Sequence, residues 1–179
     1  YKRQIVLNVT DTGIISNEPS TRTEDTGFVT TFTQGDQIGL FAVKDGAILD
    51  EINNMPFTFN GSSWSGKPIL YDDRLVGVNF YAYYPYQPEM TGKTDLIGDD
   101  FFAPLAADWE LTTEQSDQKA YAKQDLMTSN ATALIGENGN YSLSFQLTHR
   151  MSLVVVKLPS TRYIFTDAEG VAMPEETPY

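Results

Sequence analysis

His149 is the only histidine of the chain, and it stands alone as a candidate for acid–base chemistry. A catalytic histidine base needs a nucleophile within hydrogen-bond reach. In a serine triad, an acidic residue also hydrogen-bonds the other ring nitrogen of the histidine. Distant residues can assemble such a triad, but the G-x-S-x-G turn that presents a nucleophilic serine is absent. The chain has no second histidine and no cysteine to share a metal with His149. We therefore interpret His149 as a structural residue and expect no enzyme activity, metal site or cofactor.

Adjacent carboxylates form a second group with chemical potential. They include Asp72-Asp73, Asp99-Asp100 and Glu175-Glu176. Glycoside hydrolysis uses two carboxyl groups about 5 to 9 Å apart across a sugar-sized cleft. Neighbours on a strand point to opposite faces instead, and no EF-hand calcium loop is present. We interpret these pairs as solvated acidic loops.

Aromatic side chains are concentrated in the sequence FYAYYPY, residues 80 to 86. Exposed rings can stack on the apolar faces of sugars, which makes Trp64, Tyr81, Tyr83 and Tyr84 candidates for glycan binding. Packing in a core, with aromatic pairs between strands, explains the same residues equally well. The sequence leaves both interpretations open.

Charge and hydropathy exclude several partners. The formal net charge is −12, and the twelve Lys and Arg residues are scattered along the chain. An acidic surface repels nucleic acid and anionic lipid. The apolar runs are only a few residues long, as at residues 153–156, whereas a membrane-spanning helix needs about 20. We expect no nucleic-acid partner and no membrane span.

Short segments in which apolar and polar residues alternate, separated by turn residues, position these side chains. Residues 4–9 place Ile5, Leu7 and Val9 on one face, and residues 141–148 alternate strictly between apolar and polar. Further strands are expected at 28–32, 37–43, 56–60, 75–86 and 151–158. Asn60-Gly61 predicts a hairpin turn. With almost no amphipathic helix, the sequence predicts an all-β antiparallel sandwich that forms one domain over residues 1–179.

The order of these segments resembles the fimbrillin-like family of bacterial surface proteins. The resemblance begins with TRTEDTGFVTTFTQGDQIGLFA (residues 21–42) and continues with the Asn-Gly turn beside Trp64 and with FYAYYP. It ends with DLM (residues 125–127) and FQLTHRMSLVVVKL (residues 145–158). Each segment is weakly specific, but the ordered set covers most of the chain.

The resemblance implies a two-domain, transthyretin-like β-sandwich pilin that is exported as a lipoprotein and built into surface fimbriae. In such fimbriae a protease cuts after an arginine, the first strand leaves, and a strand of a neighbouring subunit replaces it. The expected partners are other pilin subunits, at the outer membrane or in the fimbrium. The alternative function is a carbohydrate-binding or tip adhesin module. The chain lacks the lipobox cysteine of the family and ends at Tyr179, where a second domain is expected.

Arg22 is the arginine that we expect to be cut. It lies in a long polar connection after the first strand, whereas a cut at Arg3 would precede the strand and release nothing. Loss of Ile5, Leu7 and Val9 would leave an apolar surface beside unpaired backbone, which invites another strand. The alternative is an ordinary first strand of a stable monomer, followed by a flexible loop.

Overall fold

The computed structural model describes residues 3–12, 31–111 and 123–151, and within them the fold is almost entirely β. The strands are β1 (Ile5–Asp11), β2 (Gln37–Lys44), β3 (Ala47–Ile48), β4 (Met55–Phe59), β5 (Trp64–Gly66), β6 (Asn79–Tyr84), β7 (Met127–Thr128), β8 (Thr132–Ala133), β9 (Ile135–Glu137) and β10 (Asn140–His149). The short helices are η1 (Asp50–Ile52), η2 (Asp73–Leu75) and α1 (Ala103–Ala107). The all-β fold class is confirmed.

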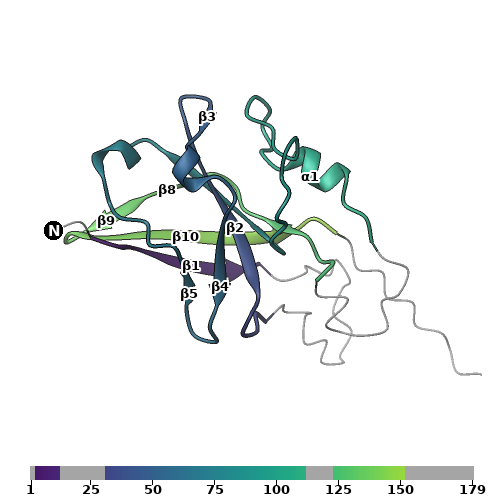
Figure 1. Cartoon of the computed structure of the whole chain (residues 1–179), viewed down its shortest axis with the longest axis horizontal. Coiled ribbons are helices and arrows are strands. Elements are labelled where there is room, and N and C mark those ends of the chain that lie inside the picture. The colour runs from purple at the N-terminus through teal and green to yellow at the C-terminus, as the bar shows by residue number, and fades with distance from the viewer. Residues whose placement is uncertain (1–2, 13–30, 112–122, 152–179) are drawn as a thin grey trace, which may run out of the picture.

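The strands are joined in the order β1-β10-β7-β6-β2-β4-β5, with β3 on β2, β8 on β6 and β9 on β10. The pairing is antiparallel between the described strands except between β1 and β10, which run parallel. Ile5 lies opposite Tyr141 and Asp11 opposite Leu147, and Figure 1 shows the two strands side by side. Periodicity predicts which face of a strand is buried but not its direction. The parallel pair is therefore a departure from the expected antiparallel arrangement.

β10 connects two layers of strands. Its first residues pair with β9 and β1, whereas Thr148 and His149 pair with Thr128 and Met127 of β7. The strict alternation predicted for residues 141–148 is present, because Leu143, Phe145 and Leu147 are buried. These side chains meet the first of two core clusters, between β1 and β10 on one side and β2, β4 and β6 on the other.

The second core cluster covers the opposite face of β2 and β6. Phe41 and Tyr83 pack there against Phe101, Phe102 and Leu105, which come from α1 and the residues just before it. β2 is consequently buried on both faces, as its nearly continuous apolar run indicates. β2 and β6 contribute side chains to both core clusters, so the packing of each cluster depends on these two strands.

Two glycines allow backbone arrangements that other residues would hinder. The expected hairpin of β4 and β5 turns at Asn60-Gly61, where Gly61 has a φ of 99° and the Asn60 side chain accepts hydrogen bonds from the Ser62 and Ser63 amides. Gly39 allows a close approach instead, since a Cβ there would lie 2.2 Å from the Tyr83 ring. The expected strands at 28–32 and 151–158 lie almost entirely outside the described residues.

Candidate functional site

Among the described strands, β1 lies at one end of the sheet order and is anchored chiefly to β10. On its other side, the described residues give it an isolated bridge from Gln4 to Leu70 and a 2.8 Å hydrogen bond from the Ile5 amide to the Ile69 carbonyl. Ile5 and Leu7 are buried in the first core cluster and Val9 is half-buried against it, whereas Val6 points outward and is 58% exposed. β1 thus fills the core with one face, and among the described residues β10 is the strand that forms a continuous ladder with it.

Polar side chains tie β1 to β10 along its length. Arg3 donates to the Gly139 carbonyl and Asn8 to the Ser144 hydroxyl, 3.4 Å away. The Thr10 and Thr12 hydroxyls donate to carbonyls of β10 at 3.3 and 3.2 Å. These contacts supplement the ladder and set the register between the parallel strands. The position that β1 occupies, on the edge of β10 and over the first core cluster, is called the β1 site below.

A buried triad of Asp11, His149 and Asp125 closes the end of the β1 site. His149 Nε2 lies 3.1 Å from Asp11 Oδ1, and Nδ1 lies 2.8 Å from Asp125 Oδ2, in the geometry of an ion pair rather than of an aligned hydrogen bond. The side chains of His149, Asp11 and Asp125 are only 6%, 4% and 6% exposed. The Asp125 carboxylate raises the pKa of His149 above its ordinary value; burial opposes this rise, and Asp11 adds to it.

The triad favours a structural role for His149 over a catalytic one. Each ring nitrogen faces a carboxylate, so neither is directed at a hydroxyl nucleophile. The two carboxylates lie on opposite sides of the ring and cannot converge on one ion. Within residues 3–12, 31–111 and 123–151, no group of three or more metal-ligating side chains is arranged to hold a metal.

The aromatic residues proposed for glycan stacking do not form one surface. Tyr83 and Tyr84 are fully buried, on opposite faces of β6, where no sugar can reach them. Tyr81 stacks on Phe101, with ring centroids 4.2 Å apart, whereas Trp64 packs against the first core cluster. For Tyr83 and Tyr84, burial favours core packing, the second of the two interpretations that the sequence left open.

A different aromatic group surrounds a hollow that the sequence did not indicate. Phe32, Phe59 and Trp64 lie together, with centroids 5.1 Å apart for Phe32 and Trp64 and 5.2 Å apart for Phe59 and Trp64. They line a surface hollow of about 320 Å³ together with Val9 and Asp11 of β1. Phe32 and Phe59 belong to different expected strands. Phe32 precedes β2, and the pairing of β2 with β4, together with the hydrogen bond from the Gly35 amide to the Phe59 carbonyl, brings the two segments together.

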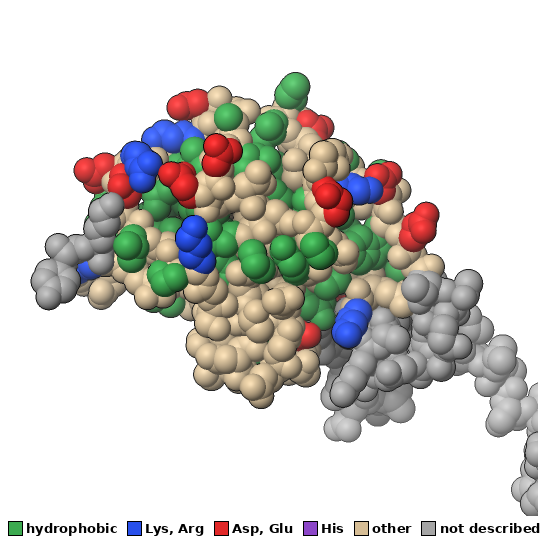
Figure 2. All heavy atoms as spheres, in the orientation of Figure 1, with side chains coloured by type: hydrophobic (Ala, Val, Ile, Leu, Met, Phe, Trp, Pro, Cys, Tyr) green, Lys and Arg blue, Asp and Glu red, His purple; other side chains and the backbone are tan. Residues whose placement is uncertain are grey.

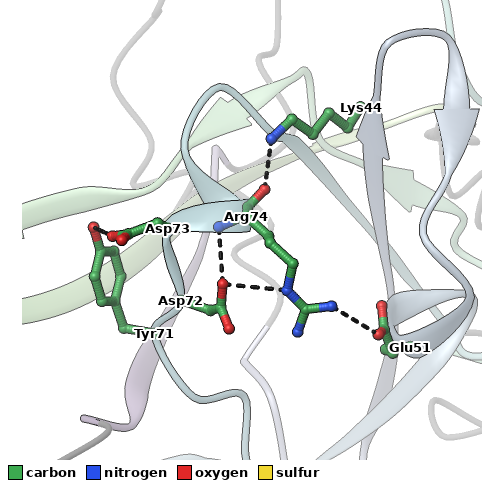
Figure 3. A network of polar contacts seen from close by, with 6 residues as sticks. All are labelled: Lys44, Glu51, Tyr71, Asp72, Asp73 and Arg74. Atoms are coloured by element: carbon green, nitrogen blue, oxygen red, sulfur yellow. Dashed lines mark hydrogen bonds and ion pairs between the residues drawn. The ribbon is translucent and has the colours of Figure 1, made fainter.

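The adjacent carboxylates point apart, as expected. Figure 3 shows that Asp72 accepts from Arg74 at 3.2 Å, whereas Asp73 accepts from the Tyr71 hydroxyl at 3.2 Å. Arg74 also reaches Glu51 at 3.4 Å. These contacts describe a surface network without a cleft between paired carboxyl groups.

Other candidates are spread over the chain. Asp100 pairs with Arg150 while Asp99 is exposed. Glu175, Glu176 and Arg22 lie outside the described residues. Figure 2 shows basic side chains spread among acidic ones on the visible face. Within the part of the chain that the structure describes, no helix has the length and apolar character needed to cross a bilayer.

Sheets with an accessible edge can pair with strands of other chains, as in several surface assembly systems. The sequence model of a family described as fimbrillin-like matches residues 21–175. Because the match covers most of the chain, the chain belongs to the fimbrillin-like family.

Two proteins of Bacteroides ovatus are very similar to this chain. One is named as a candidate fimbrium tip subunit, Fim1C, and is 99% identical over 175 residues, which are 98% of this chain and 33% of that protein. The other is a fimbrial protein with a solved crystal structure, 93% identical, with a TM-score of 0.81 over 100% of this chain and 35% of the other. The chain therefore spans about a third of the length of these relatives.

Proposed function

We propose that this chain is the strand-accepting domain of a fimbrial subunit on the bacterial surface. In this proposal residues 1–179 act as one domain, the precursor reaches the outer membrane as a lipoprotein, and a protease cuts after Arg22. β1 then leaves, and a strand of a neighbouring pilin subunit occupies the β1 site. The observation that carries the proposal is the position of β1, an edge strand whose inner face completes the core.

Energetics favour replacement of β1 over an empty site. Burial of an aliphatic side chain contributes about 1.5 to 3 kcal/mol, so exposure of the surface beneath Ile5, Leu7 and Val9 is costly. Departure of β1 also removes the partner of β10 along residues 141–147. Unpaired strand edges recruit further strands through main-chain hydrogen bonds. A new strand restores both contributions, which gives assembly its driving force.

Limited digestion with an arginine-specific protease tests this proposal. We expect early cleavage after Arg22, a fragment that begins at Thr23, and a product that self-associates or takes up a donor peptide. Arg74 provides an internal comparison, because its side chain pairs with Asp72 and Glu51 and its backbone lies in η2. An Arg22→Gln variant should resist the early cut, whereas Arg3→Gln should not. Cleavage first at Arg74 or Arg162, or a cut chain that stays monomeric and refuses every donor strand, would contradict the proposal.

A second candidate function is adhesion at the fimbrium tip through a glycan. The similar protein named as a candidate tip subunit supports the location, and the hollow lined by Phe32, Phe59 and Trp64 offers partly exposed rings for stacking. A glycan array should then show binding that Trp64→Ala abolishes. Tyr81→Ala is the comparison, because Tyr81 lies in the other cluster and should leave binding intact. An array without any bound glycan would leave the chain with the building-block role alone.

A further inference from the structure

The inward face of β1 ends in a charged residue rather than an apolar one. Asp11 continues the spacing of two that begins with Ile5, Leu7 and Val9, and its side chain is only 4% exposed. Burial of a carboxylate is unfavourable unless an opposite charge or a hydrogen-bond donor compensates it. His149 Nε2 contributes to this compensation at 3.1 Å. Seen from the domain, the β1 site accepts three apolar side chains and then a carboxylate.

His149, the partner that Asp11 contacts at 3.1 Å, belongs to the part of the domain that remains when β1 leaves. His149 is the last residue of β10 and pairs with Met127 of β7. Asp125 lies just before β7 and contacts His149 Nδ1 at 2.8 Å, and the Arg150 amide donates to the Leu126 carbonyl at 2.7 Å. These contacts hold the imidazole ring with Nε2 directed at the β1 site. Loss of β1 therefore removes the partner of one buried ring nitrogen but leaves the ring in place.

We propose that His149 selects the strand that replaces β1. The replacement comes from a second fimbrial subunit, runs parallel to β10, and carries an acidic residue at the register of Asp11, two positions beyond three alternating apolar residues. A strand with an amide or apolar side chain there leaves Nε2 buried opposite a group that cannot neutralise the imidazolium. His149 is thus a positioning and specificity residue of the β1 site. This inference rests on the proposed strand exchange.

Charge supports an acidic residue at this position. Asp125 is fixed on the Nδ1 side, so a protonated His149 retains one carboxylate and presents its second N–H to the incoming strand. The apolar part of the pattern provides most of the burial but fits many strands, since alternating aliphatic residues are common in sheets. The carboxylate discriminates between strands, because a strand without it leaves the buried His149 Nε2 without a hydrogen-bond acceptor.

Competition with synthetic strands tests the inference. The full chain is nicked with the arginine-specific protease, and fluorescent peptides spanning residues 3–12 compete with β1, with binding followed by anisotropy. The matched control peptide exchanges the acidic and amide residues, N8D/D11N, so composition and net charge stay the same while the carboxylate moves to the exposed outer face. We expect this peptide to bind about tenfold or more weakly than the natural sequence.

A His149→Gln chain provides the second arm of the test. Without the imidazole, the natural and exchanged peptides should bind within about twofold of each other. A purely structural His149 would weaken both peptides alike and leave their ratio unchanged. If His149→Gln does not fold, equal affinity of the two peptides for the natural chain still overturns the inference.

The outcomes separate the inference from the proposed function. Equal affinity of the two peptides for the natural chain, or a preference that persists in His149→Gln, overturns selection by His149 while strand exchange stands. If no peptide displaces β1, including the natural sequence, strand exchange itself fails and the inference fails with it.

Discussion

His149 illustrates how far single residues can be interpreted without a structure. As the only histidine of the chain, it has no second histidine with which to share a metal. The two carboxylates beside it could not be predicted, because Asp11 and Asp125 come from separate segments that meet only through the β1–β10 and β10–β7 pairings. The sequence contains the participants of the triad but no local signal for their contact.

The raised pKa of His149 gives the fold a defined pH dependence. A group whose pKa is higher in the folded chain stabilises the fold fully below its unfolded pKa, near 6.5 for histidine, and loses this effect as the pH rises through the folded value. Substitution of His149 by Gln should lower the free energy of unfolding by about 1.5 to 3 kcal/mol in mild acid. The difference from the natural chain should shrink as the pH rises above the unfolded value and through the raised pKa of His149.

Urea unfolding at several pH values measures this difference directly. Gln146→Ala is a suitable control, since Gln146 is exposed on the outer face of the same strand and should show a pH-independent effect. A difference that grows toward alkaline pH would contradict the assignment of His149 as a stabilising cation.

Tyr83 and Tyr81 give a second comparison at the residue scale. Tyr83 is buried, and its hydroxyl lies 2.8 Å from Asn54 Oδ1 and accepts from the Gln87 amide at 3.0 Å. Tyr83→Phe should therefore cost about 1 to 3 kcal/mol, because polar partners stay buried without the hydroxyl. Tyr81→Phe, in the half-buried ring that stacks on Phe101, should change stability by less than about 0.5 kcal/mol. Thermal unfolding of both variants checks the order, and equal effects would refute the importance of the buried hydroxyl.

Among the elements, β1 shows that apolar–polar alternation predicts the buried face of a strand but not its partner or direction. Alternation correctly places Ile5, Leu7 and Val9 on the inner face, because the pleat alone determines that face. The partner and direction of β1 depend on the path of the intervening chain, which the residues of the strand do not encode. The parallel pairing with β10 was therefore beyond sequence reasoning.

The two faces of β1 predict opposite mutational effects. Leu7 is 7% exposed in the first core cluster, so Leu7→Ala should cost about 2 to 5 kcal/mol of unfolding free energy. Val6→Ala, at a side chain that is 58% exposed, should cost less than about 0.5 kcal/mol. Chemical denaturation measures both, and amide hydrogen exchange should show faster opening of β1 only for Leu7→Ala. A larger effect at Val6 would show that the outer face is the buried one.

β6 shows why an aromatic strand was open to two interpretations. Its rings alternate between the two core clusters, so Tyr83 and Tyr84 face opposite sides and both are covered. A strand with one wet face would expose every second ring, as a glycan platform requires. The nearly continuous apolar run of β2 indicates that the sheet is buried on both faces. The residues that bury the second face, Phe101 and Phe102, lie in a segment without periodicity, so the sequence does not identify them.

At the scale of the whole molecule, shared strands connect the two core clusters. β2 and β6 contribute side chains to both, and β10 belongs to both layers of strands. Figure 1 shows α1 on the upper side of the molecule, away from β1. The second cluster therefore supports the face of β2 and β6 opposite the one that packs against β1 and β10. Exchange of β1 would leave this second cluster intact as a scaffold for an incoming strand.

Because the clusters share strands, we expect the chain to unfold in one cooperative transition. Phe102→Ala in the second cluster should cost about 3 to 5 kcal/mol, and Leu143→Ala in the first about 2 to 5 kcal/mol. Both variants should lower the midpoint of the same transition, with coincident curves from near-ultraviolet and far-ultraviolet circular dichroism. Ile97→Ala, at a fully exposed side chain, should leave the midpoint unchanged. If Phe102→Ala instead splits the transition, so that the first cluster melts at its original midpoint, the two clusters are independent and residues 1–179 do not behave as one domain.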